Sequence, residues 1–164
     1  MARYLLSFEG VTLTAVADTV NMTDSGYPFF LQGGNGSMRL NVSELYVGGE
    51  SAASAVTKLK FARDSTVAAT GISGGRNANT DGSGTAPGTL AVFGNVSTTK
   101  PQRSSTLHLL ALSFNAFGGV IRWVARQGEE ISVVGNTASL GEASLSAFTA
   151  GAGIVSGHCA YEVA

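Results

Sequence analysis

The sequence has one cysteine and little charge. Cys159 is the single cysteine among 164 residues, which excludes a disulfide framework and a zinc site built from several cysteines. Charged residues make up 13% of the chain, against about 25% in ordinary proteins, and the formal net charge is −1. A chain without a basic run is a poor candidate for binding nucleic-acid phosphates, so we expect no nucleic-acid partner. It also lacks the run of about 18 apolar residues that a membrane-spanning helix needs, so we expect no membrane partner.

The apolar run near the start of the chain is short. It ends at Phe8, where Glu9 and Gly10 follow. A secretory signal needs an apolar core of about 7–15 residues followed by a small-residue cleavage site. We therefore expect the protein to be made in the cytoplasm of the producing cell, without a signal peptide.

Glycine and short apolar runs are abundant. Glycine contributes 22 of the 164 residues, about twice the usual share. Runs rich in Val, Ile, Leu, Thr and aromatic residues alternate with Gly, Asn, Asp and Ser, which is typical of strands and turns. The one helix-like segment is Glu50–Val56, with a loop as its alternative. We predict strands at Tyr4–Phe8, Val11–Val16, Met38–Val47, Thr57–Arg63, Leu90–Val96, Thr106–Phe114, Gly119–Ala125, Glu130–Val134, Ala143–Phe148 and Gly157–Val163.

Several predicted strands alternate with a period of two. In Leu59-Lys60-Phe61 and in Ile121-Arg122-Trp123, the two apolar residues share a face opposite the basic one. Leu107–Phe114 is apolar on both faces, as expected of a central strand that is covered on both sides. Many short strands without interleaved helices favour two packed sheets. We therefore predict an all-β chain that forms one jelly-roll-like β-sandwich domain over residues 1–164, with long Gly-rich loops.

Two catalytic or metal-binding motifs fall in the Gly-rich segment Thr70–Gly88. The residues Gly-Ile-Ser-Gly-Gly from position 71 match the nucleophile elbow, which places its serine between a strand and a helix. The residues that follow cannot form that helix, so we assign no catalysis to Ser73. Asn77, Asn79 and Asp81 resemble the first half of a calcium loop, but its twelfth position is glycine rather than glutamate. The alternative there is a run of Asx turns.

Three further patterns have simple structural explanations. His158 and Cys159 adjoin on a predicted strand and therefore point to opposite faces, which prevents them from holding one ion or forming a nucleophilic pair. The glycines at 151 and 153 precede a strand rather than the helix of a phosphate-binding loop. Glu129 and Glu130 lie at a turn, where adjacent carboxylates are solvated. We therefore predict no enzyme activity, and no catalytic, cofactor-binding or metal-binding residues.

An aromatic cluster is the clearest candidate for a ligand patch. Tyr27, Phe29 and Phe30 surround Pro28 in an otherwise polar segment. If they are exposed, they form a platform on which a sugar or a base could stack. If they are buried, they cap one end of the sandwich. The sequence leaves both interpretations open.

The C-terminal strands resemble those of small jelly-roll proteins in tailed-phage virions. Gly119–Gly135 reads as an Arg/Trp strand, a Gly-Glu-Glu turn and a Val-Val-Gly strand end, and Ser156–Val163 reads as a closing strand that ends near Tyr-Glu. The similar proteins are capsid decoration (cement) and minor structural proteins, and the resemblance covers Gly119–Val163. It implies a non-enzymatic protein on the capsid surface of a virion. Its implied partners are the major capsid protein and copies of itself, in a trimer or another symmetric assembly.

Three hypotheses of function follow. The first is a structural virion protein that binds and stabilises an assembled capsid lattice, which suits the low charge of a surface partly buried in protein contacts. The alternative is a lectin-like or receptor-binding module of a head fibre, spike or tail that uses the aromatic cluster. An enzyme of an unfamiliar β-sandwich type is the third. The candidate lattice contacts, in the N-terminal segment and two polar loops, are Arg3, Tyr4, Arg76, Asn79, Asp81, Lys100 and Arg103.

Overall fold

The chain is all-β in the computed structural model, which describes residues 2–18, 20–22, 28–32, 39–66, 76–79, 90–93, 101–134, 141–148 and 153–164. These residues form eleven strands, and no helix occurs among them. The strands are β1 (Ala2–Leu13), β2 (Phe29–Gln32), β3 (Arg39–Glu50), β4 (Val56–Thr66), β5 (Arg76–Asn79), β6 (Leu90–Phe93), β7 (Gln102–Asn115), β8 (Phe117–Val124), β9 (Ile131–Val134), β10 (Glu142–Ala147) and β11 (Gly153–Val163). The all-β prediction is confirmed.

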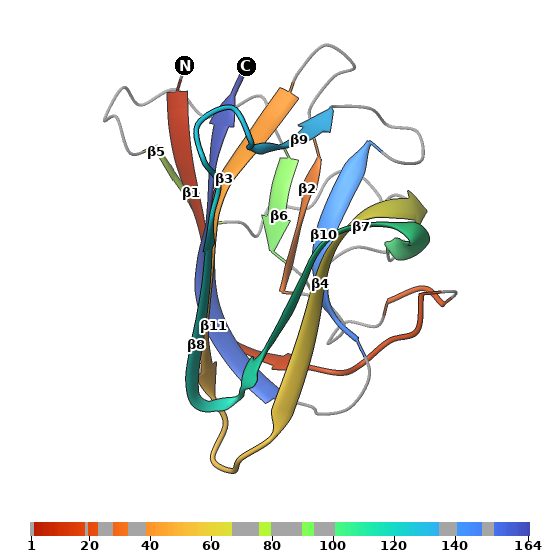
Figure 1. The fold of residues 1–164 in the computed structure, drawn as a ribbon, viewed down its shortest axis with the longest axis vertical. Helices are drawn as coiled ribbons and strands as arrows, with labels where there is room; N and C mark the ends of the chain where they lie inside the picture. The colour runs from red at the N-terminus through yellow and green to blue at the C-terminus, as the bar shows by residue number, and fades with distance from the viewer. Residues whose placement is uncertain are drawn as a thin grey trace.

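The strands form two antiparallel sheets that pack face to face (Figure 1). Sheet A has the order β5-β1-β11-β3-β8, with β9 also paired to β3, and sheet B has the order β6-β2-β10-β4-β7. With β5, β6 and β9 set aside, the other strands, counted along the chain, stand in the orders 1-8-3-6 and 2-7-4-5. The chain therefore crosses between the sheets at most of its connections. The predicted β-sandwich is confirmed.

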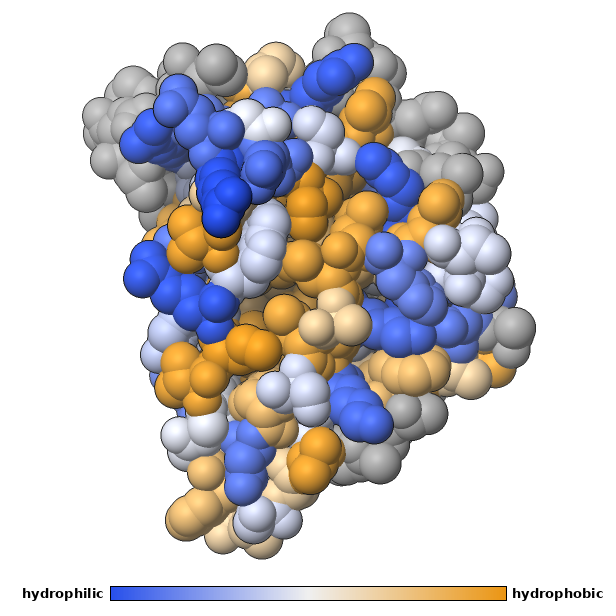
Figure 2. Space-filling view, in the orientation of Figure 1, coloured by the Kyte–Doolittle hydropathy of each residue, from blue (hydrophilic) through white to orange (hydrophobic). Residues whose placement is uncertain are grey.

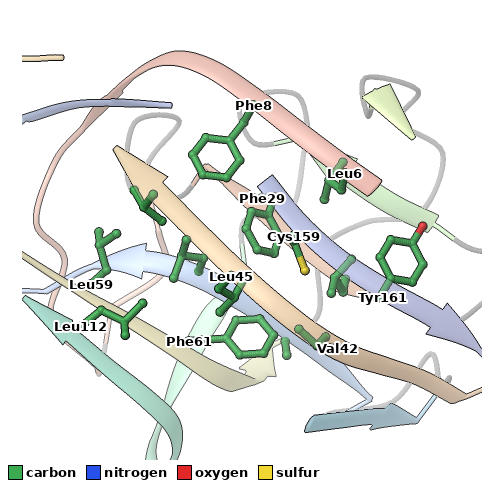
Figure 3. Close-up of a cluster of buried hydrophobic side chains, with 14 of the residues drawn as sticks. Leu6, Phe8, Phe29, Val42, Leu45, Leu59, Phe61, Leu112, Cys159 and Tyr161 are labelled. Carbon is green, nitrogen blue, oxygen red and sulfur yellow. The ribbon is translucent and has the colours of Figure 1, made fainter. Parts of the chain in front are cut away.

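The core lies between the sheets and follows from the period of two along each strand. Leu59 and Phe61 of β4 are buried, whereas Lys60 between them points to the outer face of sheet B. Figure 3 shows Leu45 and Cys159 of sheet A in one cluster with Phe29 and Phe61 of sheet B. The predicted alternation in β4 is confirmed, and one hydrophobic cluster joins both sheets.

Local details differ from the sequence-based expectations in three places. Glu50–Val56 is not helical: it ends β3, turns and begins β4, so the loop alternative holds. The first two predicted strands are one strand, β1, which bulges after Phe8 where Gly10 adopts a positive φ of 61°. Strands β2 and β5 were not predicted, because β2 is a short run between polar segments and β5 lies in the Gly-rich segment Thr70–Gly88, which has almost no apolar residues.

Strand β7 is not the central strand that its composition predicts. Within the described residues it pairs with β4 on one side only and ends sheet B. Leu107 is 38% exposed, and Leu109 and Leu110 are half-buried. The predicted central position of Leu107–Phe114 is therefore wrong, because β7 lies at an edge. Its two faces also differ: Leu110 and Leu112 pair with the buried Phe61 and Leu59, whereas Ala111 and Ser113 pair with Lys60 and Lys58 on the outer face.

The outer face of sheet B is covered, whereas sandwich strands usually expose one face. The chain leaves β1 and passes over this face, where Val16 N donates to Ala147 O at 3.2 Å and Met22 N donates to Pro101 O at 2.8 Å. Side chains on the outer face of β2 and β10 are consequently buried. Side chains are therefore buried on both faces of sheet B at these strands.

Alanine substitutions at two glycines, on the neighbouring strands β3 and β11, test how these strands pair in sheet A. A Cβ on Gly157 of β11 would lie 2.0 Å from the Tyr46 carbonyl oxygen and 2.8 Å from Phe8 Cζ, whereas a Cβ on Gly48 of β3 would meet nothing closer than 4.0 Å. We expect Gly157→Ala to lower the free energy of unfolding by about 1–3 kcal/mol, because the strands must separate to admit it. Gly48→Ala should leave stability unchanged or raise it by about 0.5–1 kcal/mol.

Urea denaturation of the two glycine variants measures this difference as a shift in midpoint at constant slope. Equal midpoints for Gly157→Ala and Gly48→Ala would contradict the pairing of β11 with β3.

Candidate functional site

The edge strands β7 and β8 lie on the same side of the sandwich and are joined through Ala116 (Figure 1). We name this surface, formed by β7 and β8, the β7/β8 side. In the part of the chain that the structure describes, each of these strands has a sheet neighbour on one side only. Their free edges therefore present backbone N–H and C=O groups with no ladder partner, the arrangement that pairs with strands of other chains.

The β7/β8 side is rich in apolar side chains. Phe117, Val120 and Val124 of β8 are 59%, 58% and 54% exposed, and Val120 and Val124 point to the outer face of sheet A, where they pair with Gly48 and Glu44. Figure 2 shows hydrophobic residues along the middle of the molecule between β8 and the strands of sheet B, with hydrophilic residues on both flanks. Half-buried hydrophobic residues that pack against the core from β7 and β8 are Leu109, Leu110, Phe114, Ile121 and Trp123. An apolar surface with a polar rim is typical of a protein contact.

A concave surface lies on the outer face of sheet A. This groove has a volume of about 840 Å³ and crosses β1, β11 and β3. Gly48 lines it without a side chain to fill it, and Ser7 and Ser156 add hydroxyl groups. The missing side chain at Gly48 therefore helps to hollow this face of the sheet.

Aromatic rings and an ion-pair network flank the groove. The rings of Tyr46 and His158, which are cross-strand partners, stack with centroids 5.2 Å apart and planes 8° apart. Glu44 accepts hydrogen bonds from Arg122 Nε and Nη2 at 2.8 and 3.1 Å, and His158 Nε2 lies 3.2 Å from Glu44 Oε1. The Arg122 bonds outweigh partial burial and hold the pKa of Glu44 below its usual value.

The outer face of sheet B holds a buried polar cluster. Gln32, Asp64, Glu142 and Ser144 are all buried there, and Ser144 Oγ donates to Asp64 Oδ1 at 2.7 Å. Burial, together with the neighbouring Glu142 carboxyl, holds the pKa of Asp64 well above its usual value. The sequence analysis did not find this cluster, because its members come from three strands that are distant along the chain.

A separate ion-pair network ties the segment after β1 to sheet B. Asp18 accepts from Arg103 Nε at 2.5 Å and from Lys60 Nζ at 3.2 Å, and His108 Nε2 lies 3.4 Å from it. Burial favours a higher pKa for Asp18, but the bonds from Arg103 and Lys60 outweigh it and lower that pKa. Lys60 Nζ also lies 3.2 Å from the ring centroid of Phe148. This network fixes the layer that covers sheet B.

Two of the three residues of the predicted ligand patch, Phe29 and Phe30, are not on the surface. Phe29 and Phe30 are 0% and 1% exposed, because β2 is an inner strand of sheet B that is covered on both faces. Exposed stacking on these two rings is therefore wrong. The rings are buried, as in the alternative interpretation, but they lie on an inner strand and do not cap the end of the sandwich. Tyr27 lies outside the described residues.

The described candidates for lattice contacts divide between two places: four lie on the paired strands β1 and β5, and Arg103 lies on β7 of the other sheet. Tyr4 is buried and stacks on Tyr161, and Arg103 is buried in the Asp18 network, so neither side chain is available as a contact. Arg3 is exposed and bonds Glu162 at 2.6 Å.

Two of the remaining candidate contacts lie at the edge of sheet A. Arg76 and Asn79 fall on β5, which pairs with β1 at that edge. Asp81 and Lys100 lie outside the described residues.

The expectation for His158 and Cys159 is confirmed, because Cys159 is buried in the core while His158 faces the groove. Burial also raises the pKa of the Cys159 thiol, as expected of an unreactive core cysteine. Ser73 and Asp81 lie outside the described residues. Among the described residues, no three His, Cys, Asp or Glu side chains gather closely enough to hold a metal ion by themselves. None of these residues forms a helix with the length and hydropathy of a membrane span.

Comparison of the chain with models of known families, with curated proteins and with solved structures found no match.

Proposed function

We propose that this chain is a non-enzymatic structural protein of a virion, a capsid decoration protein that binds an assembled lattice through its β7/β8 side. The observation that carries the proposal is the position of β7. A strand rich in apolar residues suits the middle of a sheet, yet within the described residues β7 ends sheet B and leaves Leu107 38% exposed. Contact with another protein on that side would cover the strand as its composition requires.

The strand order supports the same proposal. The orders 1-8-3-6 and 2-7-4-5 favour the jelly-roll form of the sandwich, in which two Greek keys fold into two sheets. Viral capsid and lectin domains both use this architecture. A fold carries no function by itself, so the choice between these classes rests on the surface.

The proposed mechanism is bridging. Each copy buries its β7/β8 side against capsid subunits, with apolar contacts from Phe117, Val120 and Val124 and with backbone hydrogen bonds along the free edges. Because the protein binds the assembled lattice better than separate subunits, mass action raises the stability of the assembled state. No chemical step is needed, and no cofactor is assigned.

Two charged substitutions on β8 test the binding surface. We expect Val120→Lys/Val124→Lys to fold normally, because both side chains point outward, and to bind particles at least about tenfold more weakly, because lysine must be desolvated in the contact. The measurement is co-sedimentation with particles that lack the protein. Val20→Lys is the matched control, because Val20 is 54% exposed but belongs to neither edge strand.

Equal co-sedimentation of the double variant and the control would contradict binding through the β7/β8 side. The same particles, heated with and without the wild-type protein, test stabilisation, for which we expect a higher opening temperature in its presence. Equal opening temperatures would contradict the stabilising role.

The groove on sheet A favours a second candidate, a carbohydrate-binding module. It combines the Tyr46 and His158 rings with the carboxylates of Glu9 and Glu50 and with serine hydroxyls. Such a mixture suits a neutral sugar, whose ring packs on aromatic carbon while its hydroxyls bond polar groups. This candidate replaces the aromatic cluster around Phe29 as the site of a lectin-like function.

A further inference from the structure

The outer face of sheet B carries a polar cluster formed by three strands. Gln32 of β2, Glu142 of β10 and Asp64 of β4 are 2%, 0% and 0% exposed. Gln32 and Glu142 are direct cross-strand partners, and the Asp64 carboxyl is hydrogen-bonded to that of Glu142. Ser144, two residues after Glu142 on the same face of β10, donates to Asp64 at 2.7 Å. Two carboxyl groups, an amide and a hydroxyl therefore meet in a buried space.

This cluster is incompletely bonded. Gln32 Oε1 and Nε2 and Asp64 Oδ2 are buried without a hydrogen-bond partner. Buried polar atoms are almost always bonded, so three such atoms in one cluster call for an explanation. Arg103 lies opposite Asp64 in the pairing of β7 with β4, but its guanidinium donates to Asp18, Ser146 and backbone carbonyls instead.

We propose that the cluster of Gln32, Asp64, Glu142 and Ser144 is a binding site for one divalent cation, Ca²⁺. Carboxylate, amide and hydroxyl oxygens are the hard ligands that Ca²⁺ prefers, and two carboxylates balance its charge. Mg²⁺ keeps several of its waters, which a fully buried ligand set does not accommodate. The calcium site is thus distinct from the Asn77–Asp81 motif in the Gly-rich segment.

A proton shared between the two carboxyl groups is the competing explanation. It relieves their repulsion, but it leaves Gln32 Oε1 without a partner. A cation among the side chains bonds Gln32 Oε1 and both carboxylates at once. The bonding of Gln32 therefore separates the two explanations.

Metal analysis and thermal unfolding of the full chain test the proposal. Protein equilibrated with Ca²⁺ and then dialysed should retain one calcium per chain by mass spectrometry. After EDTA treatment, CaCl₂ at 100 times its dissociation constant should raise the Tm by about 5–10 °C, and MgCl₂ at the same concentration should raise it much less. Absence of bound calcium together with an unchanged Tm would overturn the proposal in favour of the shared proton.

Two near-isosteric variants locate the ion. Gln32→Met removes the unbonded amide, so the metal-free protein should be as stable as the wild type or more stable, while most of the Ca²⁺-induced shift is lost. Asp64→Asn should also lose most of that shift. Gln127→Met, at an exposed position, is the control and should keep it. A full Ca²⁺ shift in either Gln32→Met or Asp64→Asn would overturn the assigned ligand set.

Discussion

Replacing Phe29 by alanine is expected to lower the free energy of unfolding by about 3–5 kcal/mol, because the substitution leaves a cavity in the core. The Phe29 ring is fully buried and packs between Phe8 and Phe61, with centroids 5.7 and 6.2 Å away. These rings come from both sheets, so the cavity would open in the layer that joins them. Chemical denaturation measures the loss directly.

Phe117→Ala is the matched control for Phe29→Ala, because Phe117 is 59% exposed at the start of β8. Its stability should stay within about 0.5 kcal/mol of the wild type. If Phe29→Ala were as stable as Phe117→Ala, Phe29 would not be a core residue, and the aromatic cluster would return as a candidate ligand patch.

Replacing Arg103 should lower the free energy of unfolding by as much as replacing a core aromatic residue. Its side chain is 1% exposed and donates to Asp18 and Ser146 and to the backbone carbonyls of Val16 and Ala147. Arg103→Ala leaves these acceptors without their buried donor, which costs about 3–5 kcal/mol and lowers the Tm by about 10 °C. Calorimetry measures both quantities.

Arg122→Ala is the control that separates the effect of burying an arginine from the effect of the hydrogen bonds it donates. Arg122 also donates two bonds to a carboxylate, Glu44, but its side chain is 60% exposed. Exposed ion pairs add little to stability, so the Tm of Arg122→Ala should not change measurably. Equal losses in Arg103→Ala and Arg122→Ala would show that the layer over sheet B is not closed as described.

The fold class was predictable because strand patterns are local. Leu59-Lys60-Phe61 and Ile121-Arg122-Trp123 each alternate over a few residues, and the structure places their apolar members on the core side. Glycine, asparagine and aspartate between the strands identified the turns. Each of these signals is read within one strand and needs no knowledge of its neighbours.

The position of a strand within its sheet was not predictable in the same way. Composition says that β7 should be covered on both faces, but it does not say whether the cover is the same chain or another one. Phe29 and Phe30 were ambiguous for a related reason. Their strand has only four residues between polar segments, and only its pairing with β10 and β6 makes it an inner strand.

The buried polar cluster depends on contacts between residues that are even farther apart along the chain. Gln32, Asp64 and Glu142 meet because β10 pairs with both β2 and β4. On β4, Lys60, Ala62 and Asp64 alternate like residues on a solvated face, yet the segment after β1 passes over that face. Nothing local in the sequence indicates this second layer.

Sedimentation of a native extract tests the central claim most directly. The proposal predicts that the protein travels with megadalton particles and stays with them through a salt wash, because its contact through Phe117, Val120 and Val124 is apolar and is not screened by salt. If the protein instead runs as a single copy or a small oligomer, apart from any particle, the structural proposal is contradicted. The groove beside Tyr46 and His158 then becomes the leading functional site.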